Sequence, residues 1–290
     1  MAQAPHAPSG RGFGATADPE VPPGVDPVAP APARLYDYYL GGSNNFEIDR
    51  IAAERLRESL PELSDAAWAN RGFHQRAAAW LAAGPGIRQF IDIGAGLPTE
   101  GNTHEVVRRG KPDARVVYVD HDPMVLAHAQ QLLSGTAATR FVLADLRDPA
   151  SVLGHPELLE LIDLSEPAGL LMTAVLHFVA DSDDPWALVQ RYMSALAPGS
   201  YLVLSHATGD KLPPRAVQAM VKTYENATEK LVLRSRPEVE RFFAGLDLVP
   251  PYAGAEPGIS FTGQWGAVDP IAADSDGSRV LYCGVAKRPG

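Results

Sequence analysis

The most constraining feature of the sequence is a short apolar run that ends in two glycines. Residues 88–96 read RQFIDIGAG, with one carboxylate, Asp92, among the apolar side chains. The run is brief, rich in β-branched and aromatic residues and stopped by glycine, which predicts a buried strand. A turn built on Gly94 and Gly96 lets the backbone approach a ligand closely, because glycine has no Cβ. Ligands of open α/β sheets bind beyond the carboxyl ends of such strands, so this turn predicts a binding site.

Two cofactor classes, and an ordinary turn in an unrelated α/β protein, compete as interpretations of this turn. A dinucleotide-binding turn needs a third small residue so that helix and strand pack closely, but Thr99 occupies that position. The Asp92 carboxylate would also repel a pyrophosphate. It would not repel a cofactor that has a positive centre and an amino-acid ammonium. Asp92 together with Gly94, Ala95 and Gly96 therefore favours S-adenosylmethionine over a nicotinamide dinucleotide.

Two further apolar runs end in acidic residues. Residues 114–120 end at Asp120, which His121 follows, and the next such run is followed by Asp145 and Leu146. A carboxylate at the first of these ends can accept hydrogen bonds from both ribose hydroxyls of a nucleoside cofactor. The carboxylate at the second end is placed to accept from the adenine amino group. A helix cap is the alternative interpretation of Asp145.

A fourth run covers residues 168–175 and contains almost no polar side chain, which is typical of a central strand buried on both faces. His177, just beyond Ala174 and Val175, can act as a general base, orient a substrate or bond to the backbone. The remaining predicted strands cover residues 201–206, 246–249 and 280–286. No helix is predicted between the last two, so they must pair antiparallel. The Gly- and Pro-rich loop between them includes residues 263–266, which can fold over the site.

The chain before residues 88–96 divides by composition. Residues 1–33 are rich in Pro, Ala and Gly and contain almost no large apolar side chains, which predicts a disordered tail. Residues 34–86 predict an N-terminal helical cap, with helices over residues 47–58 and 64–82. The polar residues of the second helix are interpreted as its solvated face: Asn70, Arg71 and His74.

The start of this cap is unusually dense in aromatic and amide side chains. Tyr36 and Tyr39 belong to a group of three tyrosines within four positions, and Asn44 and Asn45 follow a glycine pair. One interpretation is an aromatic helix packed on the core and followed by a turn. The other is a pocket wall that offers hydroxyls and amides to a ligand. His104, in the turn after the first strand, is likewise either a pocket residue or a surface residue.

Composition narrows the class of protein. The chain has 290 residues, 46% of them hydrophobic, as in a globular protein with a real core. The formal net charge of −10 disfavours a broad nucleic-acid surface, although it does not exclude a local basic patch. The single cysteine, Cys283, permits neither an internal disulfide nor a cysteine zinc cluster; we expect it to be buried, and we predict no metal site. No apolar run reaches membrane-spanning length and no signal pattern opens the chain, so we predict a cytoplasmic protein.

The order of elements resembles a class I S-adenosylmethionine-dependent methyltransferase. The matching motifs are residues 92–96 (its first motif), Asp120 (its ribose acid), Asp145 with Leu146 (its adenine-edge pair) and residues 176–179 (its motif after the fourth strand). Three segments are similar to a bacterial S-adenosyl methyltransferase subfamily of unknown substrate: residues 36–46, 96–105 and 119–123. The resemblance implies an α/β fold, a Rossmann-like seven-stranded sheet with an antiparallel last strand. It brings neither a substrate nor an assigned base. The fourth strand also lacks the Asn/Asp-Pro-Pro-Tyr of many amine methyltransferases, which argues against nucleobase and glutamine N-methylation.

We therefore expect methyl transfer from S-adenosylmethionine, with a small molecule as the acceptor. The expected units are a tail (1–33), a helical cap (34–86) and a Rossmann-like methyltransferase domain (87–290). The cofactor-binding candidates are Asp92, Gly94, Ala95, Gly96, Asp120, His121, Asp145, Leu146, Ala174 and Val175. The substrate-binding candidates are Tyr36, Tyr39, Asn44, Asn45, His104 and His177, and of these His177 and Tyr36 are also the catalytic candidates. A non-catalytic cofactor-binding regulator and an NAD-dependent oxidoreductase stay open as alternatives, and the sequence does not determine the oligomeric state.

Overall fold

A computed structural model describes residues 18–133, 136 and 138–290 of the protein, and within them the strands form one mixed sheet. The strands lie in the order β3-β2-β1-β4-β5-β8-β6, and β7 pairs with β8 outside this path. Their bounds are β1 Gln89–Ile93, β2 Arg115–Asp120, β3 Thr139–Leu143, β4 Gly169–Thr173, β5 Tyr201–Ala207, β6 Asp247–Leu248, β7 Ser260–Phe261 and β8 Leu281–Lys287.

The five central strands are parallel, and β8 runs antiparallel to β5, as predicted. The short strand β6 also pairs antiparallel with β8, which confirms the expected arrangement of the two closing strands. The two-residue strand β7 was not predicted, because it lies within the Gly- and Pro-rich loop. The Rossmann-like fold class is therefore confirmed, with one more strand than the seven expected.

Helices surround this sheet, and many of them begin at a proline, whose fixed φ suits the first helical turn. Their bounds are α1 Pro32–Tyr39, α2 Glu47–Arg57, α3 Leu63–Ala83, α4 Thr103–Gly110, α5 Pro123–Leu132, α6 Pro149–Leu153, α7 Pro156–Leu161, α8 Pro185–Ala195, α9 Pro214–Glu225 and α10 Arg236–Glu240. Short 3-10 turns follow β4, at Leu176–Phe178, and precede β8, at Ser278–Val280.

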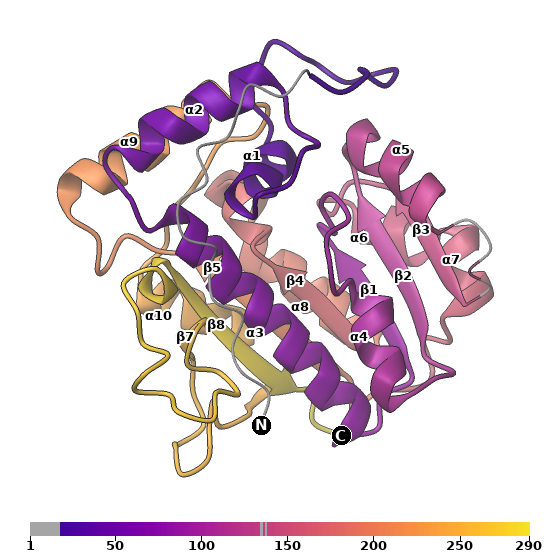
Figure 1. Ribbon diagram of the computed structural model, residues 1–290. Helices are drawn as coiled ribbons and strands as arrows, with labels where there is room; N and C mark the ends of the chain where they lie inside the picture. The colour runs from indigo at the N-terminus through magenta and orange to yellow at the C-terminus, as the bar shows by residue number, and fades with distance from the viewer. Residues whose placement is uncertain (1–17, 134–135, 137) are drawn as a thin grey trace.

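Two hydrophobic cores lie on opposite faces of the sheet, because successive side chains of a strand point to opposite sides. In β1, Ile91 and Ile93 pack with side chains of α6, α7 and α8, whereas Phe90 packs with those of α3 and α4. Figure 1 shows α3 crossing one face of the sheet and α8 on the other. Asp92 has the same parity as Phe90, so the alternation directs its carboxylate to the α3 face.

A third core holds helices α1, α2 and α9 together over one end of the sheet. Leu35 of α1, Leu56 of α2 and Met220 of α9 are buried in it, and Figure 1 shows the three helices gathered there. The covering layer therefore includes α9, which lies far beyond the predicted cap of residues 34–86. Helix α3 was predicted as part of the cap, but most of its length packs on the sheet. Whether cap and sheet are separate units stays a prediction.

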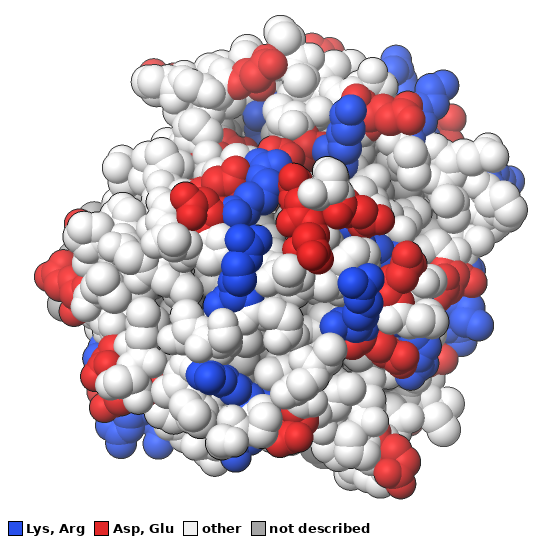
Figure 2. All heavy atoms as spheres, turned by 180° about the vertical axis from the view of Figure 1, so that it is seen from behind, with Lys and Arg blue, Asp and Glu red and all other residues white. Residues whose placement is uncertain are grey.

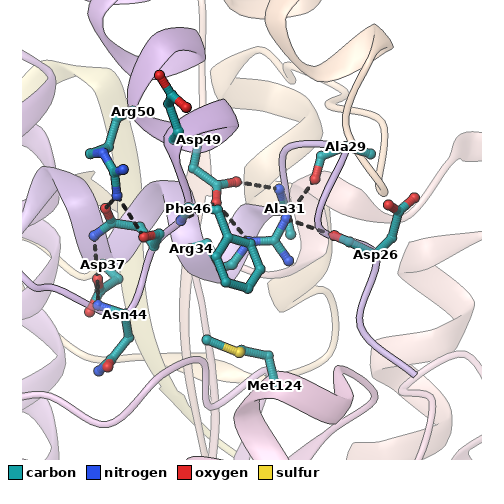
Figure 3. Close-up of polar contacts among 12 residues, drawn as sticks. Asp26, Ala29, Ala31, Arg34, Asp37, Asn44, Phe46, Asp49, Arg50 and Met124 are labelled. Carbon is teal, nitrogen blue, oxygen red and sulfur yellow. Dashed lines mark hydrogen bonds and ion pairs between the residues drawn. The ribbon is translucent and has the colours of Figure 1, made fainter. Parts of the chain in front are cut away.

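The segment that leads into α1 is held by a buried ion pair. Arg34, 1% exposed, donates from Nε to Asp49 Oδ2 at 2.7 Å, and its guanidinium also reaches the Asp26 and Ala29 carbonyls (Figure 3). Asp49 in turn accepts from the Ala31 amide at 3.0 Å. The prediction of a disordered tail is therefore wrong for residues 18–33, because a cation downstream in the chain satisfies their backbone carbonyls. Residues 1–17 lie outside the described part of the chain.

The long loop before β8 packs beside α3, away from the cavity described below. Arg76 of α3 donates to the carbonyls of Thr262, at 2.8 Å, and Trp265, at 2.7 Å. Trp265 is buried against the rings of Phe73 and Trp80. Residues 263–266 therefore do not fold over the site, contrary to the expectation.

The described residues contain no helix that is long and apolar enough to cross a membrane. Cys283 is a buried free thiol, as predicted, and burial raises its pKa to about 12.

Candidate functional site

A cavity lies at the carboxyl ends of β1, β2, β3 and β4 and is covered by α1 and α9. It is the place that the strand-turn pattern of residues 88–96 predicts. All ten cofactor-binding candidates line it, from Asp92 at the end of β1 to Val175 after β4. Three of the six substrate-binding candidates also line it: Tyr36, Tyr39 and His177.

The glycine turn after β1 needs glycine for two different reasons. Gly94 has a φ of 71°, and a Cβ built there would lie 2.3 Å from Cγ2 of Val175. Gly96 has a φ of 65°, and a Cβ there would point into open space. Gly94 therefore lets the end of β1 lie against the chain after β4, whereas Gly96 serves the turn itself. The end of β4 is itself unusual, because Ala174 has a φ of 54°.

A chain of hydrogen bonds connects Asp92 to β4 through α3. Thr103 Oγ1 donates to Asp92 Oδ2 at 2.6 Å, His74 Nε2 lies 2.7 Å from Thr103 Oγ1, and His74 Nδ1 lies 2.9 Å from Thr173 Oγ1. Because Thr103 gives its proton to Asp92, His74 donates from Nε2 and accepts at Nδ1. Burial lowers the pKa of His74 to about 3, so the ring is neutral.

The Asp92 carboxylate thus faces the cavity, and the side chains in this chain of hydrogen bonds, Thr103 and His74, are both neutral. It is 4% exposed, and burial raises its pKa to about 6, even though Thr103 and the charge of Arg71 act in the opposite direction. A buried carboxylate with a raised pKa gains free energy when a cation binds beside it. This end of the cavity therefore suits a positively charged group.

Among the described residues, two buried polar atoms at the β1 end of the cavity have no hydrogen-bond partner. They are Nε of Arg71 and Oγ1 of Thr99, and both residues line the cavity. The other end of the Arg71 guanidinium donates to the Gly101 carbonyl at 3.0 Å, which fixes the side chain over the turn after β1. Buried donors and acceptors are nearly always paired in native proteins, so these two atoms mark places for polar atoms of a ligand.

Asp120, at the end of β2, is held by two backbone amides. Oδ2 accepts from Gly96 N at 2.9 Å and Oδ1 from Asp122 N at 3.0 Å. Each carboxylate oxygen has a second lone pair, so the side chain can still accept from two hydroxyl groups. Its pKa is raised, above all by burial, and the two amide hydrogen bonds oppose that effect. Asp120 is therefore fixed in orientation and keeps the accepting capacity that a ribose requires.

A cluster of charged side chains lies at the ends of β2 and β3. Arg147 Nε lies 2.9 Å from both oxygens of Asp145, and Glu229, from the loop after α9, lies 3.2 Å from His121 Nε2 and 3.5 Å from Arg147. The hydrogen bond to Glu229 raises the pKa of His121. Burial raises the pKa of Asp145, but the hydrogen bonds and charge of Arg147 outweigh it and leave that pKa below its usual value. Leu146, next to Asp145 in the chain, is buried and lines the cavity.

The two catalytic candidates already have partners within the protein. His177 Nδ1 accepts from the Ala207 amide at 3.2 Å, and burial lowers the pKa of His177 to about 3. The Tyr36 hydroxyl donates to the Ala67 carbonyl at 3.1 Å and accepts from Asn70 Nδ2 at 2.9 Å. With so low a pKa, His177 accepts protons poorly at neutral pH, and the Tyr36 hydroxyl is already engaged as donor and acceptor. Neither side chain therefore has the features of a general base.

Three substrate-binding candidates lie away from the cavity. Asn45 Nδ2 and the Asn44 amide donate to Asp37 Oδ2 at 2.7 and 2.8 Å, so these asparagines build the loop between α1 and α2 (Figure 3). His104, in the first turn of α4, contacts β2 instead: its amide and Nδ1 lie 2.9 and 2.8 Å from the Tyr118 hydroxyl. None of the three lines the cavity.

The sequence interpretation missed the polar residues of α3, which were assigned to a solvated face. Asn70 and His74 are each 3% exposed, and Ser205 Oγ donates to Asn70 Oδ1 at 2.5 Å. A signal was present: both residues fall in the same three- and four-residue spacing as the buried Leu63 and Ala77. A polar residue within an apolar stripe indicates a buried hydrogen-bond network. Here the network ties α3 to the ends of β4 and β5.

Comparison with known proteins places the chain in a family. Residues 19–289 match the family described as S-adenosyl methyltransferase. A DUF574 family protein from Streptomyces avermitilis is 39% identical, with a TM-score of 0.84 over 91% of this chain and 99% of that one. A candidate methyltransferase from Thermobifida fusca is also 39% identical, with a TM-score of 0.84 over 92% of this chain and 98% of that one. No protein with a curated description matches the chain.

These matches cover almost all of the chain and decide against the nicotinamide dinucleotide alternative. The chain belongs to the S-adenosyl methyltransferase family and is an S-adenosylmethionine-dependent methyltransferase.

Proposed function

We propose that the protein transfers a methyl group from S-adenosylmethionine to a small molecule held in the same cavity. The observation that carries this proposal is the continuity of that cavity. It runs from the acidic ends of β1, β2 and β3 to an apolar space beneath α1 and α9. Cofactor and acceptor would therefore meet beneath the covering helices, where a large polymer has little room.

At the β1 end, we assign Asp92 to the ammonium of the cofactor. The unpaired Arg71 Nε and Thr99 Oγ1 would hold its carboxylate. Opposite charges on Asp92 and Arg71 match the two charged groups of an amino acid. Gly94 and Gly96 would let the methionine portion approach the backbone, with Ala95 and Val175 as apolar neighbours.

At the β2 and β3 ends, we assign Asp120 to the ribose hydroxyls. The Asp145 carboxylate and the Leu146 side chain would frame the adenine, and His121 would lie at its edge. The hydrogen bond of Glu229 with His121 and its ion pair with Arg147 support this assignment, because they bring the loop after α9 over the same place.

The bound cofactor supplies an electrophilic methyl group, and the protein's task is to align it with the acceptor. Alignment alone can provide a large part of the rate enhancement, so an active enzyme needs no dedicated base. We therefore propose that His177 and Tyr36 shape the cavity and do not transfer protons. Ala174, with its unusual φ, would set the direction of the chain that leads from β4 to His177.

Charge supports a small acceptor over a nucleic acid. The face in Figure 2 has Lys and Arg interspersed with Asp and Glu, without one broad basic area, and the net charge is −10. A nucleic-acid backbone is bound through gathered positive charge. The cytoplasmic location stays a prediction from the sequence.

The cofactor site is tested by calorimetric titration with S-adenosylmethionine and S-adenosylhomocysteine. We expect micromolar binding by the wild-type protein, loss of binding in Asp120→Ala and unchanged binding in Asp113→Ala, an exposed control just before β2 and so at the opposite end of that strand from Asp120. Folded wild-type protein that binds neither ligand would refute the site. The acceptor class is tested by incubating the protein with methyl-labelled cofactor and a cell extract. Label in the fraction below 1 kDa is expected, whereas label only in protein or RNA would refute a small-molecule acceptor.

A further inference from the structure

The half of the cavity that lies beneath α1 and α9, here called the covered half, differs in chemistry from the half at the ends of β1–β3. Resting on the proposed methyl transfer, we infer that it takes an uncharged, largely apolar acceptor, a ring compound with a hydroxyl group that hydrogen-bonds to Tyr39. This assigns a chemical class to the substrate, which family membership leaves open.

The first support is the apolar lining of this half. Its walls come from α1, α9, the turn after β4, the loop after α9 and the start of β8: Tyr39, Phe178, Met220, Tyr224, Leu231 and Leu281. The rings of Phe178 and Tyr224 lie 5.5 Å apart and present aromatic surface. Apolar and aromatic walls favour apolar ligands, because such ligands leave water with little loss of polar contacts.

The second support is the distribution of charge around the cavity. Among the described residues, most of the charged side chains that line it gather at the β1–β3 half. Five of them lie near the carboxyl ends of those strands or in the turns that follow: Asp92, Asp120, Asp122, Asp145 and Arg147.

Two more are tied to the same half: Glu229 pairs with His121 and Arg147, and Arg71 bonds to the turn after β1. The eighth, Asp37 on α1, has its carboxylate bonded to Asn44 and Asn45 in the loop between α1 and α2.

His177, the titratable ring on the covered side, is neutral because burial lowers its pKa to about 3. An ionised acceptor would thus lose its hydration without gaining a partner of opposite charge.

The third support is one unsatisfied polar atom in these apolar walls. Tyr39 is 5% exposed, lines the cavity, and its hydroxyl has no hydrogen bond of good geometry among the described residues. The Tyr224 hydroxyl lies close enough to interact with it but not at good hydrogen-bond geometry; burial first, and then the charge and hydrogen-bonding interaction with Tyr224, raise the pKa of Tyr39 well above its usual value. The Tyr39 hydroxyl is therefore a neutral donor and acceptor. A single hydroxyl on the acceptor satisfies it, which gives the apolar space one directional contact.

The test uses probes of one shape that differ only in their polar group. They are 2-naphthol, naphthalene, 2-naphthoate and 2-naphthylmethylammonium, each titrated at pH 7 into protein saturated with S-adenosylhomocysteine. We expect 2-naphthol to bind at least tenfold more tightly than either charged probe, and about fivefold more tightly than naphthalene. In Tyr39→Phe, 2-naphthol should bind no better than naphthalene. The control Tyr201→Phe, at the far end of β5 beside Trp80, should keep the wild-type preference.

The outcomes separate this inference from the proposed function. Protein that binds S-adenosylhomocysteine but prefers a charged probe, or binds none of the four, overturns the assigned acceptor class and leaves the cofactor site intact. An unchanged 2-naphthol preference in Tyr39→Phe overturns the role of Tyr39. Protein that fails to bind S-adenosylhomocysteine overturns the proposed function itself.

Discussion

Replacing Asp92 with asparagine should stabilise the cofactor-free protein and weaken cofactor binding. Burial raises the pKa of this carboxyl from 3.8 to about 6, so ionising it at pH 7 costs the folded state roughly 3 kcal/mol. Because the folded pKa is the higher one, stability falls as the pH rises from about 4 to about 6 and then stays level. Asparagine removes that cost, and its Oδ1 can still accept from Thr103. The variant should therefore melt up to roughly 6 °C higher at pH 7 without cofactor.

The same variant should lose the attraction between a carboxylate and the cofactor ammonium. Truncating one partner of a buried charged pair costs about 2 kcal/mol or more, which corresponds to at least thirtyfold weaker binding. Thermal unfolding without ligand and calorimetry with S-adenosylmethionine measure the two effects separately. A variant that is less stable than wild type at pH 7 would show that burying the ionised Asp92 does not cost stability. A variant that binds the cofactor as tightly as wild type would show that Asp92 does not contact the ammonium.

Three more predictions concern the site and its support. Wild-type affinity for S-adenosylmethionine should fall about tenfold per pH unit below pH 6 as Asp92 takes up a proton, and calorimetry should find little such dependence in Asp92→Asn. Gly94→Ala should cost about 2–4 kcal/mol in urea unfolding, because it places a side chain at a φ of 71° and against Val175. Adding Val175→Ala should recover part of the packing cost, because it removes Cγ2 but leaves the Cβ of residue 175 at 2.6 Å, and no recovery would contradict the contact. Arg34→Met should lower stability by about 3 kcal/mol or more, because it leaves the Asp49 carboxylate buried without its cation, and a loss below 1 kcal/mol would contradict this.

The sheet was predictable because its strands carry strong local signals. The runs that became β1, β2 and β4 are short and apolar and end in glycine, aspartate or a turn, and such patterns need no knowledge of the rest of the chain. The antiparallel β8 followed from the absence of a helix before it. In contrast, β7 pairs through only two residues, a length at which no period can be detected.

The covering layer was less predictable, because an amphipathic pattern does not reveal what its apolar face meets. Nothing in the sequence of helix α9 shows that it packs with α1 and α2. Residues 18–31 have the composition of a disordered tail, and their order depends on Arg34 and Asp49, whose pairing is a tertiary contact. The density of polar groups near Asn44 and Asn45 likewise fitted either a turn or a pocket wall, and only their hydrogen bonds show that they close a loop.

The sequence names the polar groups that can serve a site, but only the fold shows which of them have bonding capacity left. Within the described residues, five buried side-chain atoms lack a hydrogen-bond partner, in Tyr39, Arg71, Thr99, Arg234 and Trp265. The first three line the cavity, and the other two do not. Arg71 and Thr99 lie at the end assigned to the cofactor's amino acid, and Tyr39 at the end assigned to the acceptor. Because each unpaired buried atom carries a cost that a ligand can remove, their positions argue for two ligands in one cavity, which methyl transfer requires.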